Sequence, residues 1–140
     1  MKNEIFPCLW FNGNAREAAD HYCNIFPNSK ITAENPLVVN FELNGSKFMG
    51  LNGGPEYKFS PANSYVIACE TQSEIDHYWK SLGEGGIYSK CGWLDDKFGV
   101  SWQIVPAILE KLMSDEEKAP RVVQAFMQMS KFDIKTLIDA

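Results

Sequence analysis

The sequence predicts an α+β protein built from two tandem βαβββ modules and a helical tail. The same order of strand and helix patterns occurs twice along the 140 residues. The predicted helix caps Asn14 and Thr71 are 57 residues apart, and so are Glu17 and Glu74. A fixed spacing of this kind indicates a duplicated unit.

A single domain with three parts follows from this duplication. We place module one at residues 1–57, module two at 58–106 and the tail at 107–140. The two modules together are expected to form a cup-shaped mixed sheet. The chain is 45% hydrophobic and 13% aromatic, which is enough for a packed core.

The first module begins with a predicted strand at residues 5–11, followed by an Asn-Gly turn and a helix. Asn14 is the predicted cap of this helix, with Glu17 reaching back as in a capping box. An apolar stripe then marks the buried face of the helix, which ends before Pro27. Strands are predicted at 30–32, 37–43 and 47–51, and Asn44-Gly45 is typical of a hairpin turn.

The second module repeats this order. A strand is predicted at residues 64–70, and Thr71-Gln72-Ser73-Glu74 is a capping box for the next helix. After an acidic turn, the strand at 100–105 alternates between two kinds of face. One face carries only Val, Trp and Ile, so we expect it to lie under the helix. The other carries Ser101 and Gln103, as expected for a ligand cavity.

The tail is predicted to be helical, with a short first turn or two, a longer second helix and a last helix. The first includes Leu109 and Leu112, and caps at Asp115 and Asp133 begin the other two. The middle helix carries an apolar cluster, which is more than a short helix needs for docking on its own domain. The members of this cluster are Val122, Val123, Phe126, Met127 and Met129.

Composition excludes several classes of partner. The formal net charge of −5 argues against nucleic acid and anionic membranes. No apolar run is long enough to span a bilayer, and Met1 to Glu4 leads into a strand, so we expect a cytoplasmic protein. Its cysteines form no Cys-x-x-Cys pair and are interpreted as buried reduced thiols, with a nucleophilic Cys91 as the alternative.

Several motifs are spread over both modules. They are Pro7-Cys8-Leu9-Trp10-Phe11, Ile25-Phe26-Pro27-Asn28-Ser29, Leu51-Asn52-Gly53-Gly54-Pro55, Cys91-Gly92-Trp93-Leu94 and residues 99–106. These motifs resemble those of the PhnB-like branch of the vicinal-oxygen-chelate superfamily. The superfamily includes glyoxalase I, extradiol dioxygenases and bleomycin and fosfomycin resistance proteins. The branch is often labelled 3-demethylubiquinone-9 3-methyltransferase. The resemblance covers nearly the whole chain, including the tail.

The resemblance implies metal ligands, usually His and Glu, on the first and last strands of each module. Counting back from the helix caps places the first-strand positions at Pro7 and Ser64. Aligning the hairpin glycines places the last-strand positions at Met49 and Gln103. These four residue types do not assemble a site for a divalent metal, so we expect none.

A metal-independent protein that binds a small molecule in the sheet cavity is therefore the first functional hypothesis. The predicted lining is Pro7, Leu9, Phe11, Met49, Ser64, Val66, Ser101 and Gln103. Apolar walls with a few polar groups are typical of a ligand pocket. No cofactor is expected, because the sequence has no glycine-rich turn suited to a nucleotide-type cofactor.

Two alternatives stay open. The protein could be an enzyme, either a divergent lyase or isomerase of the glyoxalase type or the methyltransferase of the family label. Glu42, His21 and Cys91 are then the candidate bases, although the catalytic residues stay unassigned. The cavity could instead be filled by its own side chains, leaving only the surface to act.

A homodimer is the expected assembly. Each module has one helix to cover one face of its sheet, which leaves strand edges and a concave face to be shielded. The resemblance also implies pairing of modules within or across chains. The apolar cluster of the tail is the predicted two-fold contact.

Overall fold

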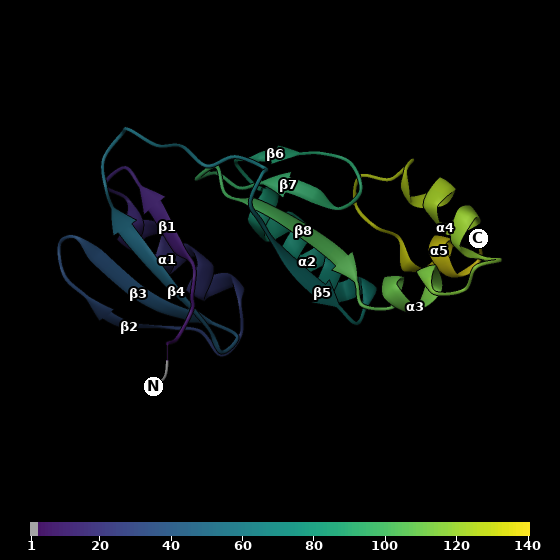
Figure 1. The fold of residues 1–140 in the computed structure, drawn as a ribbon, viewed down its shortest axis with the longest axis horizontal. Coiled ribbons are helices and arrows are strands. Elements are labelled where there is room, and N and C mark those ends of the chain that lie inside the picture. Colours follow the sequence, from purple (N-terminus) through teal and green to yellow (C-terminus); the bar gives the residue numbers. More distant parts are fainter. Residues whose placement is uncertain (1–2) are drawn as a thin grey trace. The chain divides into compact units, whose positions relative to one another are not determined.

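A computed structural model describes residues 3–140 as two compact units, Met1–Phe59 and Ser60–Ala140. Met1 and Lys2 lie outside the described residues. They begin the segment, Met1 to Glu4, from which a cytoplasmic location is predicted. Each unit contains a four-stranded mixed sheet with a helix against one face (Figure 1). The α+β class predicted from the sequence is confirmed.

Along the chain, unit 1 contains one strand, then a helix and then three further strands. Its elements are β1 (Cys8–Phe11), α1 (Ala15–Ile25), β2 (Lys30–Glu34), β3 (Val38–Leu43) and β4 (Ser46–Asn52). The strand order is β1-β4-β3-β2, with β1 parallel to β4 and the other pairs antiparallel. The hairpin between β3 and β4 turns at Asn44 and Gly45, both in the left-handed region, as predicted.

Unit 2 has the same topology. Its elements are β5 (Ser64–Cys69), α2 (Gln72–Gly83), β6 (Ile87–Tyr88), β7 (Trp93–Asp95) and β8 (Ser101–Pro106), followed by α3 (Leu109–Met113), α4 (Ala119–Phe126) and α5 (Ile134–Ile138). The strand order β5-β8-β7-β6 repeats that of unit 1. The duplication is confirmed. The two-residue strand β6 was not predicted.

The core of unit 1 lies between α1 and the sheet. Tyr22 of α1 is fully buried and stacks on Phe41 of β3, whose ring stacks in turn on Phe48 of β4. At Gly50 an added Cβ would lie 3.2 Å from the Cβ of Ala15, so the absence of a side chain there lets α1 approach β4 closely. The predicted apolar stripe of the helix is confirmed.

The two helices begin differently. Thr71 and Glu74 form the predicted capping box at the start of α2. In α1 the predicted box of Asn14 and Glu17 is wrong, because Asn14 makes no capping bond through its side chain. The Oδ1 of Asn52, at the end of β4, instead accepts a hydrogen bond from the N–H of Ala15 at 2.9 Å.

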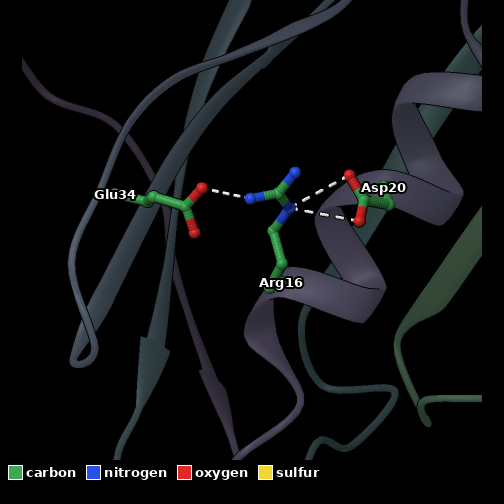
Figure 2. A network of polar contacts seen from close by, with 3 residues as sticks. All are labelled: Arg16, Asp20 and Glu34. Carbon is green, nitrogen blue, oxygen red and sulfur yellow. Dashed lines mark hydrogen bonds and ion pairs between the residues drawn. The ribbon is translucent and has the colours of Figure 1, made fainter.

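An exposed ion-pair network joins α1 to the edge strand β2. Arg16 contacts the carboxylate of Asp20 one turn along the helix and the carboxylate of Glu34 on β2 (Figure 2). Solvent screens such pairs, so the network contributes little to folding. It lies on the outer surface of the unit and has no part in the site described below.

The tail folds onto unit 2. Gln72 binds it with both ends of its amide: Nε2 donates to the carbonyl of Phe132 at 2.9 Å, and Oε1 accepts from the N–H of Ile134 at 2.8 Å. Asp133 caps α5 as predicted. The helix predicted to begin at Asp115 is shorter, because Asp115 caps a separate turn and α4 starts at Ala119. Within residues 3–140, no helix is long and apolar enough to cross a membrane.

Candidate functional site

Each sheet has one face packed under its helix and one open face. In β1, Leu9 and Phe11 are 3% and 2% exposed, and Leu9 lies level with Gly50 under α1. The predicted strand face is therefore reversed. Leu9 and Phe11 belong to the core, and the alternation of a strand places Cys8 and Trp10 on the open face. Pro7 precedes the strand, which begins at Cys8 instead of residue 5.

The reversal has a simple cause in chain length. Three residues, 12–14, join β1 to α1, whereas two residues, 70–71, join β5 to α2. Equivalent positions of α1 and α2 are 57 residues apart in the sequence, whereas equivalent positions of β1 and β5 are one residue farther apart. A shift of one residue moves every side chain of a strand to its other face. Counting back from the caps therefore identified the open face in the second module but not in the first.

The open face of unit 2 carries the predicted polar groups. Gln103 donates from Nε2 to the Oγ of Ser64 at 3.0 Å, which joins β8 to β5. Val66 lies level with Gln103 and is 58% exposed. Ser101 lies beside them but is only 1% exposed, and its Oγ donates to the carboxylate of Asp95 at 2.6 Å. The structure thus brings Ser64, Val66, Ser101 and Gln103 together on one face.

A buried carboxylate supports this face from the turn before β8. Asp96 is 3% exposed, and its Oδ1 accepts hydrogen bonds from the N–H groups of Phe98 and Val100 at 2.8 and 3.0 Å. Its Oδ2 accepts from Nε1 of Trp102 at 2.9 Å. These bonds fix the start of β8 and so the positions of Ser101 and Gln103.

A hollow of about 310 Å³ adjoins the open face of unit 2. Its lining combines an indole ring, a carboxylate and an ammonium group with small polar and apolar residues. The lining residues are Pro61, Ser89, Lys90, Trp93, Leu94 and Asp95. Trp93 lies level with Gln103, so the hollow and the polar pair share one sheet face.

The open face of unit 1 has a different character. Cys8, Met49 and Asn40 lie level with one another on β1, β4 and β3. The Oδ1 of Asn40 is buried and has no hydrogen-bond partner in the described chain. At the end of this face, Lys47 forms an ion pair with Glu4 and lies over the ring of Phe6.

These residues do not fit a divalent metal site. With the corrected face of β1, the positions level with Met49 and Gln103 hold Cys8 and Val66. Cys8 is exposed instead of buried as predicted, yet partial desolvation raises the pKa of its thiol, which favours the protonated form and weakens it as a ligand. The other three groups are a thioether, an aliphatic side chain and an amide. Among the described residues, no three His, Cys, Asp or Glu side chains are grouped so that they could hold a metal ion.

The three candidate bases lie on separate elements. His21 is on α1, next to the ring of Tyr22, and Glu42 is on β3 opposite Lys47. Cys91 lies in the turn between β6 and β7 of unit 2. None of the three belongs to the group formed by Ser64 and Gln103.

Sequence reasoning missed four residues of these faces. Asp95 was assigned to the acidic turn, and Trp93 to the segment just before that turn. Cys8 and Asn40 were not assigned to the open face. The alternation of burial along β3 would have identified Asn40, since Val39 and Phe41 on either side are apolar.

A sequence model of the 3-demethylubiquinone-9 3-methyltransferase family matches residues 3–105. The chain belongs to this family. The resemblance found in the sequence is thus confirmed for both modules of this family member. The match ends within β8, so the helical tail lies outside it, although the resemblance had been extended to the tail.

One solved structure agrees with this assignment, and a second, less similar one shares the fold alone. A Bacillus cereus structure, described as a putative 3-demethylubiquinone-9 3-methyltransferase and PhnB protein, is 32% identical, with a TM-score of 0.69. The match covers 75% of this chain and 100% of the other. A Pseudomonas aeruginosa protein is 20% identical over 74% of this chain and 96% of its own, with a TM-score of 0.62.

More distant structures share the fold alone. The fosfomycin resistance protein FosX from Listeria monocytogenes, solved with Mn(II) and sulfate, is 13% identical, with a TM-score of 0.61. That match covers 81% of this chain and 97% of the other. No curated protein matches the sequence.

Proposed function

We propose that this protein binds a small organic molecule on the open faces of its sheets without a metal ion. The observation that carries the proposal is the Gln103–Ser64 hydrogen bond beside the exposed Val66 on one sheet face. A fixed polar group beside apolar surface is the usual composition of a ligand site. The first-strand and last-strand positions hold Cys8, Met49, Val66 and Gln103, which do not form a divalent metal site.

The polar groups indicate what the ligand offers in return. The bond to Ser64 holds the amide of Gln103 in one orientation, which leaves the carbonyl oxygen as an acceptor for an N–H or O–H group of the ligand. The Trp93 ring lines the adjoining hollow and provides a flat apolar wall. Pro7, Leu9 and Phe11 are no longer part of the proposed site.

A metal titration tests the first half of the proposal. Zinc, nickel, manganese and ferrous ions are added in turn to the purified protein in a calorimeter. We expect no stoichiometric binding on the open faces. One equivalent of a divalent ion bound at micromolar affinity or better, and lost in Gln103→Leu, would contradict the proposal.

A thermal-shift screen tests the second half. Small neutral compounds with both a hydrogen-bond donor and an apolar ring are the probes. A compound that stabilises the protein should lose its effect in Gln103→Leu and keep it in Gln128→Leu, which changes an exposed glutamine of the tail. Equal stabilisation of the two variants would place the compound elsewhere.

The competing hypothesis is an enzyme, since the family description names methyl transfer. The N-terminus of a helix is a common binding place for the anionic group of a cofactor. In α1, however, the N–H of Ala15 at this end already donates a hydrogen bond to Asn52. Two assays separate the classes: calorimetry with S-adenosylmethionine, and turnover of the hemithioacetal of methylglyoxal and glutathione. Measurable binding in the first assay or turnover in the second would favour an enzyme over a binding protein.

A homodimer and a cytoplasmic location complete the proposal. The edge strands β1 and β5 each pair with one strand of their own unit, which leaves backbone groups for a second copy. The tail cluster is a poor contact, because Val122 is fully buried and Phe126 packs edge-to-face on Phe132.

Light scattering tests the assembly. We expect twice the chain mass of 15.8 kDa for the wild type and for Met127→Lys, which places a charge at the exposed end of the tail cluster. A wild-type monomer would refute the dimer. A wild-type dimer that becomes a monomer in Met127→Lys would show that the tail cluster forms the contact.

A further inference from the structure

Two sulfur atoms from separate elements meet at the surface of unit 2. The Sγ of Cys91, in the turn between β6 and β7, lies 4.0 Å from the Sδ of Met127, at the end of α4. Met127 is 56% exposed, so solvent reaches the pair. The carbonyl oxygen of Phe126 lies 3.6 Å from the same Sγ.

The backbone of Cys91 is unusual for its residue type. In the described residues, 3–140, four residues other than glycine have a positive φ, and three of them are asparagines. Cys91 is the fourth, with φ of 57° in a turn closed by a hydrogen bond from Trp93 N–H to the carbonyl of Lys90. Turns of this kind favour Asn, Asp or Gly at this position. Backbone preference therefore does not account for a cysteine here, and the side chain is the feature to explain.

The tail holds the two sulfur atoms in place. The N–H of Cys91 donates to the carbonyl of Met129 at 2.8 Å, and the N–H of Gly92 donates to the carbonyl of Ser130 at 2.8 Å. An added Cβ at Gly92 would lie 2.5 Å from the carbonyl oxygen of Ile104, so only glycine fits beside Cys91. The turn and the end of α4 thus form one anchored arrangement.

We propose that Cys91 and Met127 form a binding site for a soft monovalent cation, Cu(I). Thiolate and thioether groups are ligands that favour Cu(I). Metal–sulfur bonds are about 2.3 Å, the value for zinc, so one ion can contact two sulfur atoms up to about 4.6 Å apart. The observed 4.0 Å separation meets this limit without any movement of the chain.

The surroundings favour a cation. Phe126 is the last residue of α4, and the carbonyl end of a helix carries partial negative charge. On binding, the thiol of Cys91 gives its proton to solvent and its sulfur forms a bond to the ion, while Met127 donates a sulfur lone pair. The copper stays Cu(I) throughout, so no oxidant or reductant takes part.

This site uses none of the residues that line the proposed ligand face or its hollow, and neither proposal rests on the other. Cys91 lies in a hairpin turn, outside the rows of residues that include Cys8, Met49 and Gln103. The divalent titrations described above can be repeated on Cys91→Asn. Binding that persists there concerns the open faces and not the sulfur pair.

Competition with a coloured Cu(I) chelator, without oxygen, measures the affinity. We expect one equivalent of Cu(I) per wild-type chain and at least a tenfold loss of affinity in both Cys91→Asn and Met127→Leu. The double variant Cys23→Ser with Met113→Leu changes another cysteine and another methionine and should keep the wild-type affinity. Unchanged binding in Cys91→Asn, or a loss that instead follows Cys8→Ser, would overturn the proposal.

Two further readouts separate binding from folding. Asn is favoured at a left-handed turn position, so Cys91→Asn should keep the wild-type melting temperature or raise it. With Ag(I) as a probe that does not undergo redox cycling, a protein labelled at its methionine methyl groups should show one shifted resonance, absent in Met127→Leu. A shift confined to another methionine would place the ion elsewhere and refute the site.

Discussion

The two modules share one strand order but differ in the connection that joins the first strand to the helix. In unit 1 this connection has three residues, and Gly13 within it adopts a φ of 83°. In unit 2 it has two residues and carries its own helix cap. Because of this extra residue, the side chains of β1 face the opposite way from that predicted by counting back from the helix cap, although the two helices correspond residue by residue.

The comparison shows that a repeat in sequence fixes helices and strands separately. The buried residues Ala18 and Ile25 of α1 correspond to Ile75 and Leu82 of α2 at the 57-residue spacing. The buried Phe11 of β1 corresponds to the buried Cys69 of β5 at a spacing one residue larger. A site on the strands therefore has to be located from the strands themselves.

Alanine substitutions on β1 test the reversed face and should have the largest effect. Leu9→Ala removes a buried side chain and should lower the free energy of unfolding by about 3 kcal/mol. Cys8→Ala, on the open face, should lower it by less than about 1 kcal/mol. Urea unfolding followed by circular dichroism measures both. A larger cost for Cys8→Ala would restore the strand face predicted from the caps.

The turns before β4 and β8 offer a second contrast. Asp96→Asn replaces the acceptor that binds Trp102 Nε1 with an amide and should cost about 2 kcal/mol, because buried donors lose their partner. In unit 1 the two-residue turn has no buried acid, so Asn44→Gly should change stability by less than about 0.5 kcal/mol. Equal effects in urea unfolding would mean that the carboxylate of Asp96 does not brace β8.

The helix starts should differ less strongly. Thr71→Ala removes one local cap and should cost about 1 kcal/mol. Asn52→Ala removes the cap of α1 and also the bond from Nδ2 to the carbonyl of Pro36, so it should cost about 2 kcal/mol. Hydrogen exchange provides the control, because only Asn52→Ala should speed exchange at the N–H of Ala15. Fast exchange there in the wild type would contradict the cap.

The smallest expected effect concerns the ion pair between Lys131 of the tail and Asp76 of α2. Hydrogen bonds from Lys131 and Gln72 lower the pKa of Asp76. A carboxyl with a lowered pKa stabilises the fold above its ordinary pKa and loses that contribution as the pH falls through the lowered value. Because the pair is exposed, the gain at pH 7 should be below about 1 kcal/mol.

Unfolding of Asp76→Asn at two pH values checks this sign. The variant should be less stable than the wild type at pH 7, and the difference should shrink in acid below the lowered pKa. Glu116→Gln, which removes an exposed carboxylate of the tail, is the control for the change in net charge. A difference that grows in acid would show that Asp76 does not act through this pair.

Local signals in the sequence predicted most of the fold. The capping box of α2, the Asn-Gly hairpin and the alternation of β8 depend on residues close together in the chain, and the structure confirms all three. The open face of β1 and the cap from Asn52 depend on one loop residue and on a contact over 37 positions of sequence. Patterns within a short window contain no information about either, so the cavity face predicted for β1 was wrong.

The source of each helix cap has a consequence for the order in which the chain folds during synthesis. Once the α2 segment is complete, its cap is already present, because Thr71 and Glu74 lie within its own first turn. The α1 segment acquires its cap only after Asn52, the last residue of β4, has been made and placed beside it. During synthesis on a ribosome, α2 therefore has its cap before β6 to β8 are made, whereas α1 gains its cap only when its whole module is complete.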